Sequence, residues 1–528
     1  MLKSKKRYLL RIIIPAYPRF NVYSSIANKT TALGPLCIAA SAKEVNGWEV
    51  EVIDENNFYN SHLKTLRGEI NHKLIQNQRP ADVVGFYGGL TCTIPRIYAL
   101  AKFYKQQGVI TVAGGQHFVE ETIPEALFSG IDYIIRGEGE MTIKKLLSVF
   151  SNARDLSSIP GIAFKRKSKI IFTGQQIPIE NLDNLPLPDF SLLKYAKVKL
   201  FPVGRVRGCG MNCEFCAVKG RPRYASSQRL INQIDKLVKE MKAKEFFIVD
   251  DLFGQDRKET LNLCKMLAEY QRLEKIQLRF TVQIRLDKAK DVELLKTMRE
   301  ANIRVVTIGF ESPIDEELKA MNKSLSSQDM LELTRIFHKF GFFIHGMFIF
   351  GYPTKEKINF MMPVEERIKY FERFIKKAKL DTIQVVLPIP LPGTELRKRL
   401  LSQGRVFPLS IVGWQYYDGT FPLFKPDYPL TPQKIQLAMR KIMEHFYNIK
   451  YFFIFLLNLF SIISLPFYFN NFKSGWRRWC RRTRNYAFRI IGQRIIKIWT
   501  AQLYKEDFSK KLQRVESNIS KDAVKRNL

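Results

Sequence analysis

Short runs of β-branched and aromatic residues alternate with longer amphipathic stretches over residues 1–150. Five of these runs predict strands, because each is apolar and ends in glycine, aspartate or a polar turn. The five are YLLRIII, WEVEVID, ADVVGFY, GVITVAG and IDYIIRG. Strands joined by helical crossovers form a parallel, doubly wound sheet. We therefore predict a Rossmann-like α/β domain over residues 1–150, with its ligand site beyond the carboxyl ends of the strands.

The alternation breaks over residues 151–198, where a small hairpin and a proline-rich linker are predicted. A second alternating array then covers residues 199–405. Its six strand candidates are LFPVGRV, EFFIVDD, IQLRFTV, IRVVTIGF, FFIHGMFIF and DTIQVVLPI. Six β/α units predict a partial (β/α)6 barrel of the TIM type, in which chemistry takes place at the C-terminal ends of the strands.

A mainly helical and basic region is predicted after the barrel, with an extension over 406–450 and a tail over 451–528. Within the tail, residues 451–469 are nearly uncharged and approach the length of a bilayer span. Asn458 and Pro466 argue against a span, and a buried helix packed on the barrel is the alternative. From residue 473 onward there are sixteen Lys or Arg against four Asp or Glu.

Charge and cysteine usage narrow the class of protein. The chain of 528 residues carries 85 Lys and Arg against 50 Asp and Glu, a formal net charge of +35. Such an excess predicts an anionic partner, either nucleic acid or an anionic membrane face. Arg11 interrupts the only apolar run near the N-terminus, so no secretory signal is expected there. The seven cysteines do not suggest a disulfide framework, which favours the reducing cytoplasm.

Three of the cysteines lie within eight residues, in the stretch RGCGMNCEFCAVKG. They are Cys209, Cys213 and Cys216, and they follow the first predicted barrel strand. A zinc site would need a fourth ligand, and no histidine is nearby. Cys264 sits in an apolar helical pattern and is a poor fourth ligand. A cubane iron–sulfur cluster normally takes four thiolates, so three thiolates leave one iron open for another ligand.

This loop resembles the cluster loop of the radical S-adenosylmethionine (SAM) superfamily, with aromatic Phe215 before the last cysteine. The resemblance implies that the three cysteines bind a 4Fe–4S cluster whose open iron chelates SAM, which is then cleaved to a 5′-deoxyadenosyl radical. Other positions that match the family follow successive barrel strands, and the resemblance implies that they contact SAM. In addition to Phe215, these are Asp250, Asp251, Gln283, Arg285, Glu311, Ser312 and Gly351. One by one, such residues are more often caps or turn residues.

Residues 1–150 resemble the cobalamin (B12)-binding domain that often precedes a radical SAM core. The loops GFYGGLTCTIP, VAGGQHF and RGEGE carry this resemblance, and their glycines allow close approach of a bulky ligand. The implied cobalamin contacts are Gly88, Gly89, Thr91, Gly114, Gly115, His117, Gly137 and Glu138. The D-x-H-x-x-G signature is absent, which excludes ligation of cobalt by a histidine of that motif. A degenerate domain that binds nothing is the alternative.

Together these resemblances imply an enzyme of the class B radical SAM methyltransferase group, which methylates unactivated carbons. Residues 380–447 resemble the extension of a subgroup that includes hopanoid methylases, and this implies a lipid-like or other hydrophobic substrate. An oxidative cyclase, or another C–H functionalisation without methyl transfer, is the first alternative.

A radical SAM enzyme that modifies RNA is the second alternative, although no RNA-binding module is recognised in the sequence. A cobalamin or redox sensor would not need the complete cluster loop. An electron donor such as flavodoxin or ferredoxin is implied. The apolar and basic tail predicts association with an anionic membrane surface, peripheral or anchored at its inner face, rather than with nucleic acid.

Overall fold

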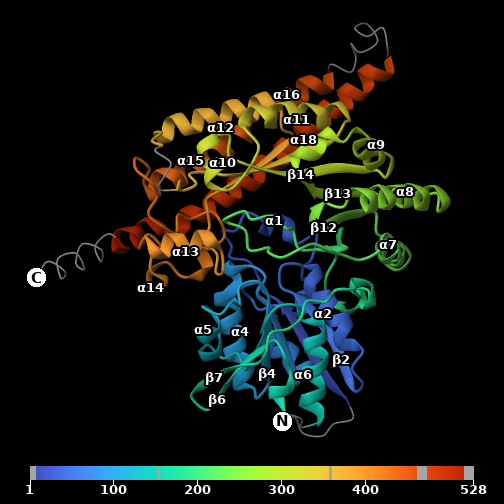
Figure 1. The fold of residues 1–528 in the computed structure, drawn as a ribbon, viewed down its shortest axis with the longest axis vertical. Coiled ribbons are helices and arrows are strands. Elements are labelled where there is room, and N and C mark those ends of the chain that lie inside the picture. The colour runs from blue at the N-terminus through green and yellow to red at the C-terminus, as the bar shows by residue number, and fades with distance from the viewer. Residues whose placement is uncertain (1–6, 153–154, 356–359, 461–471, 516–528) are drawn as a thin grey trace, which may run out of the picture.

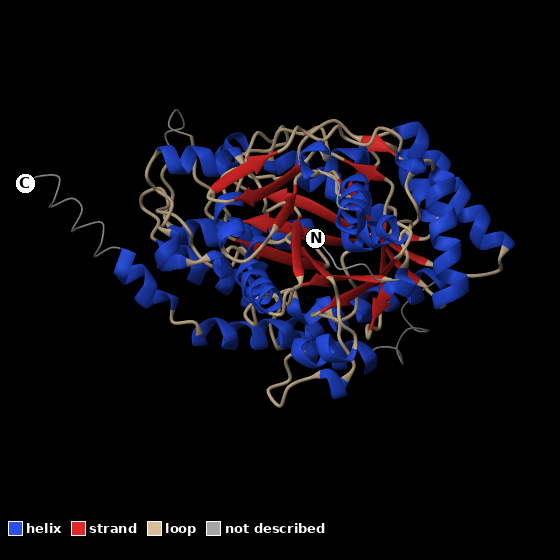
Figure 2. Ribbon diagram, turned by 90° about the horizontal axis from the view of Figure 1, so that it is seen from below, coloured by secondary structure: helices blue, strands red, loops and turns tan. Residues whose placement is uncertain are grey.

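The computed structural model describes residues 7–152, 155–355, 360–460 and 472–515. Two mainly parallel sheets form the two halves of the molecule, with the N-terminal sheet below and the barrel above in Figure 1. Viewed from below, strands occupy the middle and helices surround them (Figure 2). The predicted α/β class, with a doubly wound sheet ahead of a partial barrel, is confirmed.

The N-terminal sheet has eight strands in the order β7-β6-β5-β4-β3-β1-β2-β8. Its parallel strands are β1 (Tyr8–Ile14), β2 (Trp48–Asp54), β3 (Val83–Tyr87), β4 (Ile110–Gly114), β5 (Tyr133–Ile135) and β8 (Leu193–Lys194). Helices α1 (Ser24–Ala27), α2 (Leu33–Lys43), α3 (His72–Gln78), α4 (Ile94–Gln106), α5 (Ile123–Phe128) and α6 (Glu140–Asn152) accompany them. Arg11 lies inside β1, where its buried guanidinium bonds Glu51 at 2.6 Å.

The predicted hairpin forms, but it belongs to this sheet. Strands β6 (Ile162–Arg166) and β7 (Lys169–Phe172) pair with each other antiparallel, and β6 pairs antiparallel with β5. Strand β8 returns to the opposite edge of the sheet beside β2. The segment predicted as a linker over 151–198 therefore adds both edges to the N-terminal sheet.

The barrel sheet has six parallel strands in the order β16-β15-β14-β13-β12-β9, and its two end strands do not pair with each other. The strands are β9 (Leu200–Val203), β12 (Glu245–Phe253), β13 (Arg279–Ile284), β14 (Ile303–Glu311), β15 (Phe343–Ile349) and β16 (Thr382–Val386). Outside them lie α7 (Ser227–Met241), α8 (Arg257–Leu273), α9 (Val292–Glu300), α10 (Asp315–Ala320), α11 (Ser327–Lys339) and α12 (Val364–Ala378). A two-stranded ribbon, β10 (Val206–Arg207) with β11 (Arg223–Tyr224), brackets the cysteine-containing loop.

The C-terminal region is helical, and part of it clamps the two halves together. It contains α13 (Glu395–Ser402), α14 (Leu409–Val412), α15 (Pro432–Phe446), α16 (Lys450–Phe460) and α18 (Phe472–Lys505). Arg397 of α13 is paired with Glu121 of the N-terminal half at 3.0 Å. Trp414 donates its indole N–H to Glu125 at 2.9 Å. The extension therefore fixes how the two sheets face each other.

The apolar stretch over 451–469 is only partly described. Its first ten residues belong to α16, which packs against α18. Residues 461–469 fall outside the described part of the chain. Across the residues that the structure describes, no helix combines the length and the apolar character that crossing a membrane requires.

Candidate active site

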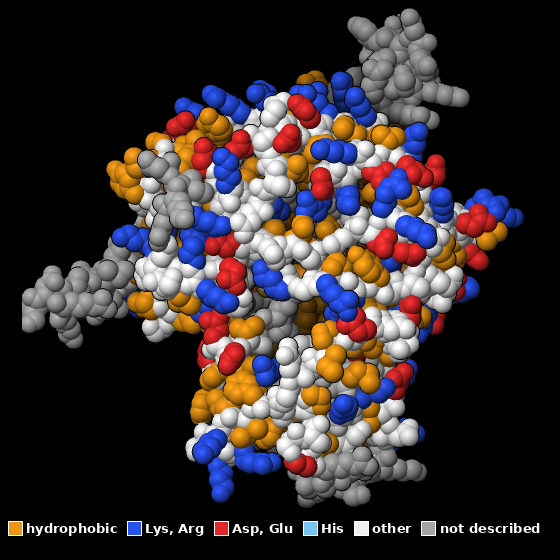
Figure 3. Space-filling view, in the orientation of Figure 1, with side chains coloured by type: hydrophobic (Ala, Val, Ile, Leu, Met, Phe, Trp, Pro, Cys, Tyr) orange, Lys and Arg blue, Asp and Glu red, His pale blue; other side chains and the backbone are white. Residues whose placement is uncertain are grey.

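The carboxyl ends of both sheets open onto one cavity of about 710 Å³. The N-terminal sheet contributes Gly114, Gly115, Gly137 and Glu138 to its wall. From the barrel side, Gly208 and Asp251 line it. Figure 3 shows the surface hollowed between the two halves of the molecule. Because strand ends of both sheets meet here, this is the place where two ligands can lie against each other.

Two glycine-containing segments, 88–91 and 114–117, form what we call the glycine loops. The N–H of Gly88 donates to the carbonyl of Gly114 at 2.7 Å, and the N–H of His117 donates to the carbonyl of Gly88 at 3.0 Å. Gly115 has φ +127°, and a Cβ there would lie 2.6 Å from the carbonyl carbon of Gly88. Glycine is required at this position because two backbones touch.

The predicted cobalamin contacts divide into two groups. Gly114, Gly115, Gly137 and Glu138 lie on the cavity wall, whereas Gly88, Gly89, Thr91 and His117 do not. His117 is buried, with Nδ1 at 3.3 Å from the hydroxyl of Thr91 and its ring edge-on to Trp414 at 4.9 Å. Burial lowers its pKa to about 3, so the imidazole is neutral. Its position supports packing of the C-terminal extension rather than a place in the ligand pocket.

Glu138 connects the two halves at the cavity. It accepts hydrogen bonds from Arg207 at 3.1 Å and from Arg223 at 2.8 and 2.9 Å. The N–H of Ile179 also donates to it, at 2.7 Å. Burial opposes ionisation of Glu138, but the bonds from Arg223 and Ile179 prevail and lower its pKa. Glu138 is therefore an ionised link between the N-terminal sheet and the ribbon that brackets the cysteines.

The cysteines lie on an irregular segment, 207–220, which we call the cluster loop. Cys209, Cys213 and Cys216 are free and partly exposed. Burial raises the pKa of the Cys216 thiol, and its neighbours Cys213 and Cys209 raise it further, so the three sulfurs lie within electrostatic range. No group of three or more Cys, His, Asp or Glu in the described ranges is arranged for a single metal ion.

Backbone and side-chain groups other than the three thiols hold the cluster loop in place. The N–H of Gly208 donates to Asp251 at 2.6 Å, and Gln255 donates to the carbonyl of Cys209 at 2.8 Å. The N–H of Gly210 closes the loop on the carbonyl of Gly220 at 3.0 Å. Three free cysteines on one fixed loop form a donor set that suits a cubane cluster with one open iron.

Glu214 and Phe215, between the second and third cysteines, turn into the protein. The carboxylate of Glu214 accepts two bonds from Arg399 of α13, at 2.6 and 3.0 Å, and one from the hydroxyl of Tyr352 at 2.6 Å. The ring of Phe215 meets that of Tyr352 edge-on at 6.1 Å. Our sequence reasoning missed Glu214 and Arg399. The sequence did offer one signal for Glu214: an acidic side chain between two closely spaced cysteines needs a basic partner if it is buried.

The two aspartates of β12 have different surroundings. Asp250 is buried and accepts the backbone N–H groups of Arg205 and Val206, at 2.7 and 2.9 Å. Asp251 lies on the cavity wall and accepts the N–H of Gly208. Only Asp251 is therefore placed to face a ligand. Asp250 instead shapes the turn that leads into the cluster loop.

The remaining predicted SAM contacts also differ in position. Glu311 has φ +62°, an uncommon conformation outside glycine, and is paired with Lys323 at 3.1 Å. Arg285 is paired with Asp287 at 2.9 Å and contacts the sulfur of Met211 in the cluster loop. Both predicted residues therefore lie around the cluster loop. Lys323, whose ammonium is 6.0 Å from the ring of Phe215, is a further cation there that sequence reasoning missed.

Three predicted SAM contacts, Gln283, Ser312 and Gly351, make no direct interaction with the cluster loop in the part of the chain that the structure describes. Gln283 is exposed near the end of β13. The Ser312 hydroxyl is fully buried, donates to Glu317 and accepts the N–H of Ile314 at 3.1 Å, so it acts as an internal cap. Gly351 has φ +74°, and a Cβ there would meet Ile435 of α15 at 3.4 Å.

Two family models match the chain in agreement with this architecture. The model of the B12 binding domain matches residues 22–147, and that of the radical SAM superfamily matches residues 204–362. The matched segments are the two parts of the chain that face each other across the cavity.

Curated relatives share the arrangement at modest identity. An uncharacterized methyltransferase of Pyrococcus horikoshii is 28% identical over 389 residues, covering 71% of this chain and 80% of that protein. The hopanoid C-2 methylase of Rhodopseudomonas palustris is 28% identical over 247 residues, covering 46% of this chain and 45% of its own length. The anaerobic magnesium-protoporphyrin IX monomethyl ester cyclase of Rubrivivax gelatinosus is 24% identical, covering 68% and 65%. The matches thus span less than two thirds of the latter two relatives.

Solved structures agree in fold. The cobalamin-dependent radical enzyme OxsB, with aqua-cobalamin and SAM bound, matches with a TM-score of 0.64 at 15% identity, covering 98% of this chain and 81% of that one. The radical SAM methyltransferase TsrM of Kitasatospora setae, with cobalamin and a 4Fe–4S cluster, matches with a TM-score of 0.59 at 17% identity, covering 75% and 78%.

The residues present fit the cofactors that these families use. A cubane cluster suits the three free cysteines, and the cavity wall opposite Gly208 and Asp251 has the glycines that a corrin needs for close approach. The cofactors are accordingly a 4Fe–4S cluster, SAM and cobalamin. With both family models matched in sequence order and both halves folded as they require, the chain is a radical SAM enzyme that carries a B12-binding domain.

Proposed function

We propose that this enzyme methylates an unactivated carbon of a lipid-like or otherwise hydrophobic substrate. The observation that carries the proposal is the single cavity, onto which the glycine-lined wall and the cluster loop both open. When bound, SAM on the cluster supplies a 5′-deoxyadenosyl radical for hydrogen abstraction, and methylcobalamin supplies the methyl group. Enclosure between two sheets keeps water from that radical.

This chain's residues have positioning roles in the proposed reaction. Cys209, Cys213 and Cys216 would hold the cluster, and Asp251 faces the cavity beside them. The ionised Glu138 fixes the distance between the two cofactor sites through Arg207 and Arg223. Because a methyl group must pass between the two sites, a fixed spacing is the property that the reaction most needs.

Support for methyl transfer comes from the relatives, and one of them supports the alternative. Relatives named as methyltransferases or methylases match this chain, and so does a cyclase. The extension over 406–450 contacts the N-terminal half, because Trp414 donates a hydrogen bond to Glu125. We propose that this extension selects the substrate. A one-electron donor such as flavodoxin or ferredoxin would reduce the cluster, and we propose that the enzyme works in the cytoplasm, peripherally at the inner face of the membrane.

The test is anaerobic reconstitution with iron, sulfide and hydroxocobalamin, followed by dithionite and SAM carrying a labelled methyl group. Supplied with a lipid extract, the enzyme is expected to form 5′-deoxyadenosine and S-adenosylhomocysteine and to place label in the organic phase. Cys213→Ala should lose iron and at least about a thousandfold of SAM cleavage, while Cys480→Ala on α18 should retain both.

The outcomes separate the candidate functions. Formation of 5′-deoxyadenosine without transfer of label would favour the cyclase-type reaction. Label recovered in added RNA would favour nucleic-acid modification. Zinc in place of iron, with no cleavage of SAM, would overturn the enzyme assignment itself.

A further inference from the structure

Helix α16 carries an exposed apolar stripe on one face. Its members recur at the spacing of neighbouring turns of a helix, so they form a continuous surface. They are Ile449 (56% exposed), which directly precedes α16, and Phe452 (41%), Phe453 (60%), Leu456 (36%) and Leu457 (69%) within it. Five large apolar side chains in one row exceed the scattered exposure that is normal for a protein surface.

The stripe faces outward because the opposite side of α16 is fixed to α18. Trp479 donates its indole N–H to the carbonyl of Asn458 at 2.7 Å, and the amide of Asn458 donates to Thr483 at 2.7 Å. The rings of Tyr451 and Tyr486 are stacked at 6.2 Å. The stripe is therefore the face that this packing leaves uncovered.

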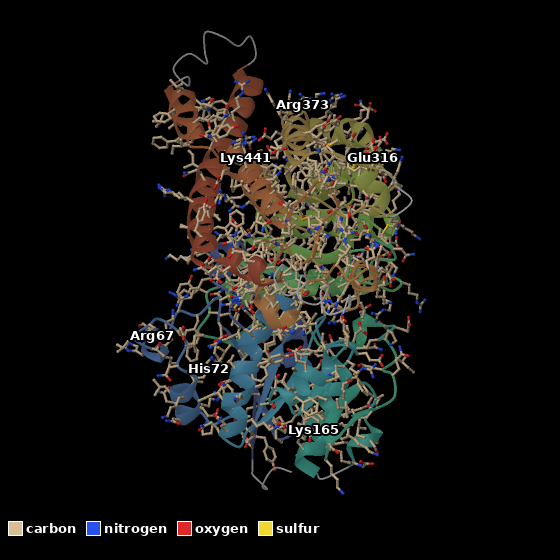
Figure 4. All side chains as sticks on the ribbon, turned by 90° about the vertical axis from the view of Figure 1, so that its left-hand side faces the viewer. Arg67, His72, Lys165, Glu316, Arg373 and Lys441 are labelled. Carbon is tan, nitrogen blue, oxygen red and sulfur yellow. The ribbon has the colours of Figure 1, made fainter. Side chains whose placement is uncertain are left out.

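Helix α18 ties this pair of helices to the barrel. Arg489 donates to the carbonyl of Leu380 at 3.1 Å, and its guanidinium lies over the rings of Phe446 and Tyr451 at 4.3 and 4.4 Å. In Figures 1 and 4 the paired helices extend to the upper end of the molecule, away from the N-terminal sheet. They form a projecting surface with a fixed direction.

The segment of the chain that contains the stripe carries only basic charges. Residues 445–505 contain eleven Lys or Arg and no Asp or Glu. Lys450, Arg482 and Arg484 are exposed on the two helices. Trp476 is 43% exposed and stacks on Trp479 at 5.2 Å. An apolar row on a pair of helices that also carries exposed cations and a tryptophan matches the chemistry of an anionic bilayer surface, in which acyl chains lie beneath headgroups.

Other occupants fit this chemistry less well. The phosphates of a nucleic acid would bind the cations, but they would not bind a row of leucine and phenylalanine side chains on a helix. A second copy of the chain would bring eleven more cations toward the first eleven, with no acid among residues 445–505 to offset them. Helix α16 has eleven residues, roughly 16 Å at 1.5 Å per residue, about half of a hydrocarbon core. It therefore suits a position in the plane of the interface.

We propose that the α16 stripe, with the exposed cations and Trp476 of α18, is a docking surface for anionic lipid bilayers. Helix α16 lies in the interface, with its apolar row among the acyl chains and the cations at the headgroups. This inference deepens the proposed action on a lipid-like substrate, since it states how the enzyme reaches the source of that substrate. It is tested by binding alone, so its failure and a failure of methyl transfer are distinguishable.

The experiment is co-sedimentation of the full-length chain with vesicles of phosphatidylcholine, with and without phosphatidylglycerol. The parent is expected to bind the anionic vesicles, and to bind less as salt rises. The double variant Phe453→Glu/Leu457→Glu should lose at least about tenfold in partitioning, because it removes two buried apolar contacts and adds two charges beside anionic headgroups. Thermal denaturation and SAM cleavage without lipid should be unchanged.

A matched control carries the same charge change elsewhere. Leu66→Glu/Leu273→Glu replaces two exposed leucines, 110% and 63% exposed, outside the C-terminal region and should bind vesicles like the parent. Equal binding by the parent and the α16 variant would overturn the proposal. A second result would also overturn it: the parent does not bind vesicles but self-associates, and the α16 variant abolishes that self-association. The stripe would then be a contact between copies of the chain.

Discussion

The glycine loops, of which segment 114–117 lines the cavity, and the cluster loop on its other side are held in opposite ways. The glycine loops bond to each other through main-chain groups, as between Gly88 and Gly114. The cluster loop has few contacts of that kind, and side chains from distant elements fix it instead, such as Asp251, Gln255 and Arg399.

This difference reflects what each loop has to present. A wall that a large ligand must approach closely needs an absence of side chains, so its shape comes from backbone alone. A loop that offers three thiols must keep them free of other bonds, so its neighbouring groups anchor it. Substitutions should therefore harm the glycine loops by adding atoms and the cluster loop by removing charges.

The largest effect is expected from Arg399→Met. The change leaves the Glu214 carboxylate buried beside Cys213 with only the Tyr352 hydroxyl as a side-chain donor. An uncompensated buried charge costs about 3 kcal/mol or more. The variant should melt at a lower temperature and retain less iron after reconstitution, as measured by thermal denaturation and iron analysis.

Two further variants show whether charge is the cause. Glu214→Gln/Arg399→Met removes both charges and should recover at least half of the lost stability and iron. Arg257→Met removes an arginine from an exposed pair with Asp291 and should have no measurable effect. If the double variant is no better than Arg399→Met, packing rather than charge holds the loop.

A smaller effect is expected from Gly115→Ala in the glycine loops. The added Cβ would lie 2.6 Å from backbone carbon, at a φ of +127° that other residues rarely adopt. Strain and overlap together should cost about 2 kcal/mol and displace the cavity wall. Bound corrinoid, measured by absorption after reconstitution, should fall at least about tenfold while the iron content is unchanged.

Gly174→Ala is the matched control for this change. Nothing lies within 4 Å of its added Cβ, so stability and corrinoid binding should remain those of the parent. Unchanged corrinoid binding by Gly115→Ala would mean that the glycine wall does not bear on the ligand.

The strands were predictable because the sequence carries their apolar runs directly. β1 and β2 coincide with the predicted YLLRIII and WEVEVID. The hairpin was predictable as a local feature, but its place in the N-terminal sheet was not. That place is decided by pairing of β6 with β5, for which the sequence shows no separate signal.

The site was predictable only where a motif lies within one loop. The three cysteines and the glycines of the predicted ligand loops could be singled out in this way; Gly114, Gly115, Gly137 and Asp251 lie on the cavity wall. Asp250 and Ser312 turn inward to bond backbone groups, which a list of strand-end residues cannot reveal. The pair of Glu214 and Arg399 joins positions 185 residues apart, so only the folded chain shows it.

The smallest expected effect is a pH dependence of stability, which we expect beside the cluster loop but not in the glycine loops. Burial raises the pKa of Asp250 to about 6, against the N–H groups of Arg205 and Val206, which favour its ionised form. A carboxyl whose folded pKa lies above its unfolded value of about 4 holds its proton more tightly in the folded state. Stability from this site is therefore present below about pH 4 and falls as pH rises to about 6, by no more than about 3 kcal/mol.

Asp250→Asn removes this titration and keeps an acceptor for the two N–H groups. Relative to the parent, the variant should gain stability between pH 4 and pH 7, as measured by thermal denaturation without cofactors. Asp251 and Arg205 are the charged groups that act on Asp250, and both remain in the variant. The stability difference between Gly115→Ala and the parent should not change over the same range, since no charge enters it. If the stability difference between Asp250→Asn and the parent also stays constant from pH 4 to pH 7, the pKa of Asp250 is not raised on folding. The two backbone donors at the entrance to the cluster loop would then keep its carboxylate ionised over this range.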